Sequence, residues 1–229
     1  MSSPPATLLS TFREAARAHG TLPPDAPLEL ETAFRAVRDI PWGPRTPAGE
    51  EADGSGLDPA ATIEAWRGTG REKQLLLAAL LQALGYHTDL LAVTHEFEAA
   101  SAPWLPPPLL QEVRQAPVPD VHLLLRVQTN RMLEEWITVD ATWPASAARL
   151  GLPVNDRVVH GADHRLACDP VEVYHLPEPD EDDEPGALYA LIARIVRDTV
   201  GDAPEAWERR GRFMTSLATW LDLATPPDA

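Results

Sequence analysis

The residues best suited to chemistry are His122 and Asp140, which lie on two stretches of alternating apolar and polar residues. Residues 121–127 and 134–140 repeat with period two, which is typical of strands with one buried face. If the chain turns around Arg131, His122 lies directly opposite Asp140, and their Cβ atoms are about 4.5 to 5.5 Å apart. An imidazole that is hydrogen-bonded to a carboxylate can act as a general base. A slip of one residue would separate the pair, because the two side chains would then lie on opposite faces.

The nucleophile that such a pair activates is missing from the expected place. In cysteine acyl-transfer enzymes the thiolate lies at a helix N-terminus, where the dipole and the free amides lower its pKa. The leucine-rich stretch from about Gly70 to Leu84 predicts a helix that is buried on most sides, and Gly85 ends it. Gly70 stands at the start of this helix, where the thiol is expected. It could also be an ordinary loop glycine before a helix.

This order of helix start, histidine and carboxylate resembles the cysteine-histidine-aspartate core of transglutaminase-like proteins, which are relatives of the papain-like proteases. Family members commonly carry Gly-Thr-Cys before a leucine-rich helix, and Gly68-Thr69-Gly70 matches that pattern apart from the cysteine. The segment Phe34–Trp42 is similar to an arginine-aspartate-isoleucine-proline segment of some bacterial members. The resemblance covers about residues 30–143. It implies an α+β fold with a transglutaminase-like or papain-like core, in which a central helix packs on an antiparallel sheet and further helices are added at both ends.

The resemblance also implies a remnant of a catalytic site. His122 and Asp140 remain as the histidine-aspartate pair, and Gly70 marks the position of the missing nucleophile. We expect four side chains near the helix start and the second strand to contact a ligand: Thr69, Arg71, Trp136 and Trp143. We expect no cofactor. Structural alternatives stay open, because His122 could be a half-buried strand histidine and Asp140 could merely cap the turn that follows it.

Without its nucleophile, the chain is expected to be a catalytically inactive homologue that binds a protein or peptide in the remaining cleft or through its helical tail. The alternative is an amide hydrolase or acyltransferase in which His122 and Asp140 act with water or a non-cysteine nucleophile. The hydroxyl of Thr69 would need an unusually strong base, and Cys168 is more typical of a small buried hydrophobe. A third hypothesis is a purely structural subunit that associates through the aromatic residues of the tail: Trp207, Phe213 and Trp220.

Charge and composition exclude several classes of partner and site. The chain has 35 acidic against 19 basic residues and a net charge of −16, which disfavours nucleic acid and anionic membranes as partners. The single cysteine excludes an internal disulfide and cysteine-rich zinc sites. We expect neither a membrane span nor a secretory signal, and therefore a cytoplasmic protein. His160, Asp163 and His164 could offer metal ligands, but such loops are usually solvated, and we assign no metal site.

The chain is expected to form one core with a helical tail. Residues 1–175 form the transglutaminase-like core with N-terminal helices, residues 176–186 an acidic, proline-rich linker, and residues 187–229 a helical tail that packs on the core. Outside the central helix and the two strands named above, the patterns predict these elements: helices at 6–19, 28–37, 59–66, 188–196 and 203–223, a strand at 87–93, a loop at 106–115 with at most a short helix, and a loop-like segment at 151–168 that could contain strands.

Overall fold

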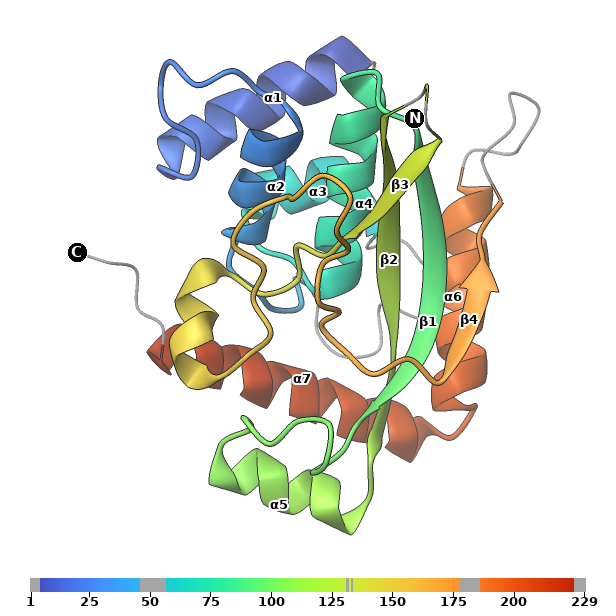
Figure 1. Ribbon diagram of the computed structural model, residues 1–229. Helices are drawn as coiled ribbons and strands as arrows, with labels where there is room; N and C mark the ends of the chain where they lie inside the picture. The colour runs from blue at the N-terminus through green and yellow to red at the C-terminus, as the bar shows by residue number, and fades with distance from the viewer. Residues whose placement is uncertain (1–4, 46–56, 131, 133, 178–185, 225–229) are drawn as a thin grey trace.

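The computed structural model describes residues 5–45, 57–130, 132, 134–177 and 186–224 (Figure 1). It has an antiparallel sheet in the order β3-β2-β1-β4 with helices around it, so the predicted α+β class is confirmed. The strands are β1 Thr88–Phe97, β2 Val118–Asn130, β3 Glu135–Val139 and β4 Glu172–His175. The helices are α1 Pro5–Ala18, α2 Leu30–Arg38, α3 Pro59–Ala65, α4 Gly70–Ala83, α5 Pro107–Gln115, α6 Ala187–Val200 and α7 Pro204–Ala224, with a 3₁₀ helix at Ala145–Leu150.

The two faces of β2 have different coverings. Leu125 on one face packs with the leucines of α4, and Leu123 on the same face packs in a cluster with Ile192 of α6. His122 and Leu124 alternate with these residues and point to the other face, where Leu124 packs near Cys168. The central strand thus separates the main apolar core from the face that carries the histidine.

The pairing of β2 with β3 corrects the expected register. Arg126 pairs with Thr138 rather than with Trp136, so the partners are displaced by two residues. The ladder also shifts between Gln128 and Asn130, close to the turn. A displacement of two residues keeps each side chain on its face, because side chains alternate with period two. His122 and Asp140 therefore still share a face, although they are not directly opposed.

Local capping explains where the helices before the site begin. Asp58 caps α3 by accepting a hydrogen bond from Ala60 N–H at 2.9 Å, and Pro59 follows at the first helical position, as the sequence predicts. Thr69 and Glu72 form a reciprocal capping box at the start of α4, in which Thr69 N–H donates to Glu72 Oε2 at 2.6 Å. The box fixes Gly70 as the first residue of the helix.

Other elements differ from the expectations in detail. The segment from Pro107 to Gln115 is a nine-residue helix, α5, where a loop with at most a short helix was expected, because Leu109 and Val113 give it a buried apolar face. Strand β1 continues past Val93 to Phe97, and β4 was not expected. Residues 178–185 of the predicted linker 176–186 lie outside the described residues, whereas Leu176 is buried and donates to Leu90 O, so the core extends into the predicted linker.

The last two helices pack against the sheet. Helix α6 contributes Ile192, Ile195 and Val196 to an apolar cluster with β1 and β2, and α7 brings Phe213 and Met214 to a second cluster. In Figure 1 α6 lies behind β1 and β4, while α7 runs along the lower part of the molecule. Within the described residues, no helix combines the length and apolarity that a membrane crossing requires.

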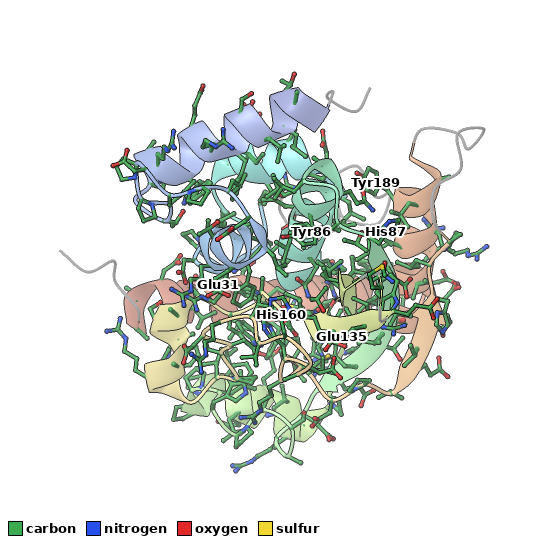
Figure 2. The ribbon with its side chains drawn as sticks, turned by 45° about the horizontal axis from the view of Figure 1, so that its top comes forward. Glu31, Tyr86, His87, Glu135, His160 and Tyr189 are labelled. Atoms are coloured by element: carbon green, nitrogen blue, oxygen red, sulfur yellow. The ribbon has the colours of Figure 1, made fainter. Side chains whose placement is uncertain are left out.

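The irregular chain from 151 to 171 covers the outer edge of β3. His164 N–H donates to Thr138 O at 2.9 Å, and Asp140 N–H donates to His164 Nδ1 at 3.1 Å. Glu31 of α2, labelled in Figure 2, accepts a hydrogen bond from Val158 N–H at 2.7 Å. This segment therefore ties the edge of the sheet to the N-terminal helices.

Candidate functional site

His122 and Asp140 form a buried pair. His122 Nε2 lies 3.1 Å from Asp140 Oδ2, and the two residues are 4% and 3% exposed. Asp140 Oδ1 accepts a hydrogen bond from Thr142 N–H, and Oδ2 also accepts one from Ala167 N–H. Asp140 therefore holds the histidine and caps the following turn at the same time. Burial opposes its ionisation, but His122 and Thr142 outweigh burial and hold the pKa of Asp140 below its ordinary value.

Gly70 stands directly in front of the other nitrogen of this histidine. A Cβ atom added at Gly70 would lie 3.2 Å from His122 Nδ1. A side chain at this position would therefore touch the imidazole on the nitrogen opposite to Asp140. Helix α4 is fourteen residues long and begins here, so its free amides and its positive dipole end point to the same place.

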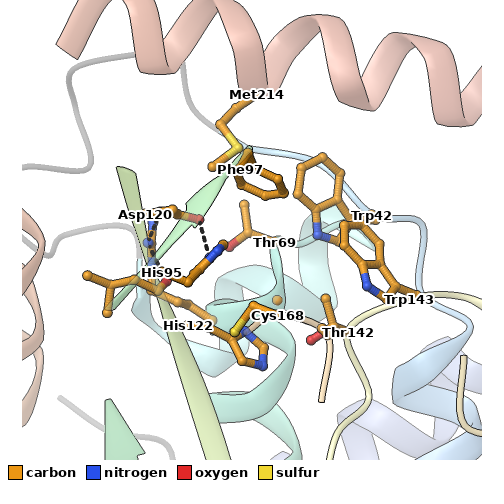
Figure 3. A pocket seen from close by; sticks show the side chains of 14 residues that line it. Trp42, Thr69, His95, Phe97, Asp120, His122, Thr142, Trp143, Cys168 and Met214 are labelled. Atoms are coloured by element: carbon orange, nitrogen blue, oxygen red, sulfur yellow. Dashed lines mark hydrogen bonds and ion pairs between the residues drawn. The ribbon is translucent and has the colours of Figure 1, made fainter. Parts of the chain in front are cut away.

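A small pocket opens between the start of α4 and strands β1 and β2 (Figure 3). Its volume is about 30 Å³, which suits water or the tip of a side chain rather than a large cofactor. One wall is apolar and includes Trp42, Phe97, Trp143 and Met214, and the polar wall carries Thr69, His95, Asp120 and His122. Ligand pockets commonly reach about 300 to 1,000 Å³, so only a small group of a ligand can enter this one.

Thr142 occupies the space in which a side chain at position 70 would lie. Its Cγ2 and Oγ1 atoms would both be 3.0 Å from a Cβ at Gly70, which is tighter than ordinary contact. Within the described part of the chain, Thr142 Oγ1 and Trp143 Nε1 are buried without a hydrogen-bond partner. Both residues line the pocket. Buried polar atoms that lack a partner cost free energy, so these two groups destabilise the pocket wall as it stands.

A second ionic cluster lies beside the pocket. Asp120 Oδ1 is 2.7 Å from both Arg71 Nη1 and Arg210 Nη2, and Oδ2 is 3.7 Å from His95 Nε2. Burial opposes the ionisation of Asp120, yet the two guanidinium groups hold its pKa well below its ordinary value. Burial also lowers the pKa of His95. Two histidines on adjacent strands thus line the pocket, each beside a different aspartate, and the His95 and His122 rings are 6.5 Å apart.

Lys73 of α4 connects the two segments that bring tryptophans to the pocket. Its Nζ donates to the carbonyl oxygens of Arg38, Ile40 and Thr142 at 2.6, 3.0 and 2.8 Å. These carbonyls belong to the segments that lead to Trp42 and Trp143. Burial lowers the pKa of Lys73 to about 7, against the opposing effect of nearby carboxylates.

The single cysteine of the chain also lines the pocket, although sequence spacing does not predict that position. Cys168 packs near Leu91, Val93 and Leu124, so it contributes to an apolar cluster as expected. Burial, followed by the charges of Asp140 and other aspartates, raises the pKa of its thiol. Cys168 is therefore protonated at neutral pH and is poorly suited to replace a thiolate at position 70.

The structure brings most, but not all, of the predicted site residues together. Gly70, His122, Thr69, Arg71 and Trp143 line the pocket, and Asp140 holds His122 from behind. Trp136 does not line it, because this residue lies on β3, where its ring contacts Arg126. Trp136 pairs with Gln128, which is six residues along β2 from His122, so the tryptophan lies far from the pocket along the strand.

The histidine-aspartate loop has structural roles in the described chain. Asp163 Oδ1 accepts a hydrogen bond from Thr138 N–H, His164 Nδ1 accepts one from Asp140 N–H, and His160 is exposed (Figure 2). No group of three or more histidine, cysteine or carboxylate side chains among the described residues is placed to hold a metal ion.

Several residues of the site were missed by sequence reasoning: His95, Asp120, Thr142, Arg210 and Met214. Asp120 is two residues before His122, so its position on the same face of β2 could have been read from the alternation. His95 pairs with Asp120 across β1 and β2, and Arg210 comes from the tail. No local pattern indicates those long-range contacts.

Comparison with known proteins adds no family to this description. No protein-family model matches the chain, and neither does any curated protein or any solved structure. What the pocket can do must therefore be judged from its own geometry.

Proposed function

We propose that the chain is a transglutaminase-like protein without its catalytic cysteine, and that it binds a protein or peptide segment at the pocket in front of His122. The observation that carries this proposal is the position of Gly70. It is the first residue of α4, and a Cβ there would lie 3.2 Å from His122 Nδ1, while His122 Nε2 contacts Asp140. A thiol at this position would have both a base and a helix N-terminus.

The absence of a side chain at Gly70 removes covalent catalysis but leaves groups that can bind. Thr142 Oγ1 and Trp143 Nε1 are buried without partners in the described chain, and aromatic rings form the apolar wall. An apolar side chain could pack on Trp42 or Phe97, which line the pocket. The pocket volume of about 30 Å³ limits the inserted part to a small group.

The experiment uses the restored variant Gly70→Cys/Thr142→Ala/Cys168→Ser. Thr142→Ala makes room for the new side chain, and Cys168→Ser leaves one thiol. Short peptidyl chloromethyl ketones of differing sequence are added, and alkylation at position 70 is followed by intact mass. We expect the rate to depend on peptide sequence, and the native protein to bind the amide of the preferred peptide without cleaving it. Rates that do not depend on sequence, with no binding by the native protein, would refute the proposal.

A second candidate is an amide hydrolase in which His122 activates water. It is favoured by one observation: the buried His122–Asp140 pair is intact, and Nδ1 faces the pocket. Amine release from acyl peptide amides by the native protein, lost in His122→Ala but kept in Cys168→Ser, would support the hydrolase and exclude the inactive homologue.

A further inference from the structure

The two edges of the sheet differ in how their backbone groups are used. The β3 edge is covered, because His164 N–H donates to Thr138 O and Thr138 N–H donates to Asp163 Oδ1. At the other edge, Leu176 N–H donates to Leu90 O at 3.2 Å. Because hydrogen-bonded pairs alternate in an antiparallel ladder, the backbone groups of Tyr174 and Glu172 also point toward β1. The amides and carbonyls of Val173 and His175 therefore point away from β1. In the described chain no residue outside the sheet bonds to these groups.

Strand β4 also exposes apolar side chains without burying any of its own. All four of its residues are exposed, and Val173 is 55% and Tyr174 39% exposed. Val171, just before the strand, is 69% exposed. Val171, Val173 and His175 lie on one face, and Glu172 and Tyr174 lie on the other. Val171 and Val173 therefore give this short edge an exposed apolar face, while Glu172 carries a charge on the other face.

The charges at this edge indicate the chemistry of the partner. Tyr174 OH donates to Glu172 Oε2, and this bond raises the pKa of Tyr174, to which the charges of Glu172 and Asp198 of α6 also contribute. The Tyr174 face of β4 therefore carries an aromatic ring and the carboxylate of Glu172. A lysine or arginine placed here would meet the Glu172 carboxylate and the ring. The Val171–Val173 face would accept an apolar side chain instead.

We propose that the β4 edge binds an extended segment of a partner protein in which basic and apolar residues alternate, and that this segment adds a fifth strand to the sheet (Figure 1). The backbone of Val173 and His175 supplies the main-chain hydrogen bonds, and the two faces select the side chains. This site is separate from the pocket and does not depend on the function proposed for it.

A second copy of the chain fits the same edge less well. Symmetric antiparallel pairing that joins Val173 to His175 would place Tyr174 opposite Tyr174 of the other copy. Glu172 of each copy would then lie opposite Leu176 of the other, so the two acidic strands would meet without a compensating positive charge in either strand and would repel each other over a longer range. The net charge of −16 adds to this repulsion.

The test uses a capped heptapeptide of alternating lysine and valine as the probe. Its control has the same composition but with the lysines and valines in separate blocks, so general attraction to an acidic protein is matched. Binding is measured by calorimetry, and amide exchange of Val173 and His175 by NMR. We expect the alternating peptide to bind at least tenfold tighter than the block peptide and to slow exchange of both amides.

Variants distinguish this edge from the rest of the surface. Val173→Glu should weaken binding at least tenfold, whereas Val159→Glu, at a valine that is 44% exposed elsewhere, should leave it unchanged. His122→Ala should also leave it unchanged, so failure of the pocket proposal and failure of this one are separable. Equal binding of both peptides, or no effect of Val173→Glu, would overturn the proposal. Sedimentation as a dimer that Val173→Glu dissociates would overturn it in favour of a second copy.

Discussion

At the scale of single residues, the site is organised around the two nitrogens of His122. Nε2 contacts Asp140 at 3.1 Å, and Nδ1 faces the position of a Cβ at Gly70. Asp140 serves three partners, because it also accepts hydrogen bonds from the amides of Thr142 and Ala167. One carboxylate thus fixes the ring of the histidine and the two backbone segments beside the pocket.

Replacing Asp140 by asparagine should therefore destabilise the protein. The charge-assisted hydrogen bonds weaken, and we expect a loss of about 1 to 3 kcal/mol in the free energy of unfolding, measured with urea. Since the pKa of Asp140 is lower in the folded state than its ordinary 3.8, the stabilisation is present above pH 3.8 and disappears as the pH falls through the folded-state value. Asp163→Asn, at an exposed single bond, is the matched control and should cost less.

At the scale of elements, helix α4 positions the site through its first turn. The capping box of Thr69 and Glu72 fixes where the helix begins, and Lys73 binds the carbonyls of Arg38, Ile40 and Thr142. The helix therefore connects the two segments that bring tryptophans to the pocket. A change in this turn should move the pocket walls as well as reduce stability.

Lys73 should give the stability of the protein a distinct pH dependence. Its pKa falls from 10.5 in the unfolded chain to about 7 in the folded one. Between these values the unfolded chain binds a proton that the folded lysine does not, so the free energy of unfolding rises with pH. The contribution is at most about 1.4 kcal/mol per pH unit. Lys73→Met should remove this rise in urea unfolding between pH 7 and 10, and an identical slope in both proteins would contradict the assignment.

The sequence predicts the elements better than the contacts between them. The cap at Asp58 and the apolar pattern of α4 are local signals, and both helices begin where these signals place them. Period two places His122 and Asp140 on one face, but the register depends on the turn and on the ladder shift after Gln128, which alternation does not encode. Thr142 takes the space beside Gly70 because two segments far apart in the sequence pack together there. No local sequence pattern indicates such a contact.

At the scale of the whole molecule, the tail is joined to the site by buried charge. Arg210 of α7 contacts Asp120 beside the pocket, and Met214, one turn later, lines the pocket itself. The sequence predicts a tail helix here but not this ion pair, because Arg210 and Asp120 are separated by 90 positions. The tail therefore forms part of the site.

Removing the tail contact should loosen α7. Arg210→Met leaves Asp120 with less compensation, and we expect a loss of about 3 to 5 kcal/mol in urea unfolding together with faster amide exchange in α7. Arg212→Ala on the same helix breaks only an exposed pair with Glu208 and should cost less than about 1 kcal/mol. Equal effects of the two variants would show that the Asp120 cluster does not hold the tail.

The most direct test of the account is the thiol pKa at position 70 in Gly70→Cys/Thr142→Ala/Cys168→Ser, measured from the pH dependence of alkylation by iodoacetamide. The same variant with His122→Ala is the control. We predict a pKa well below the ordinary value of about 8.5, and a rise toward that value in the control, because His122 and the start of α4 stabilise the thiolate. A pKa at or above 8.5 that His122→Ala does not change would contradict the central claim that Gly70 stands where a nucleophile would be activated.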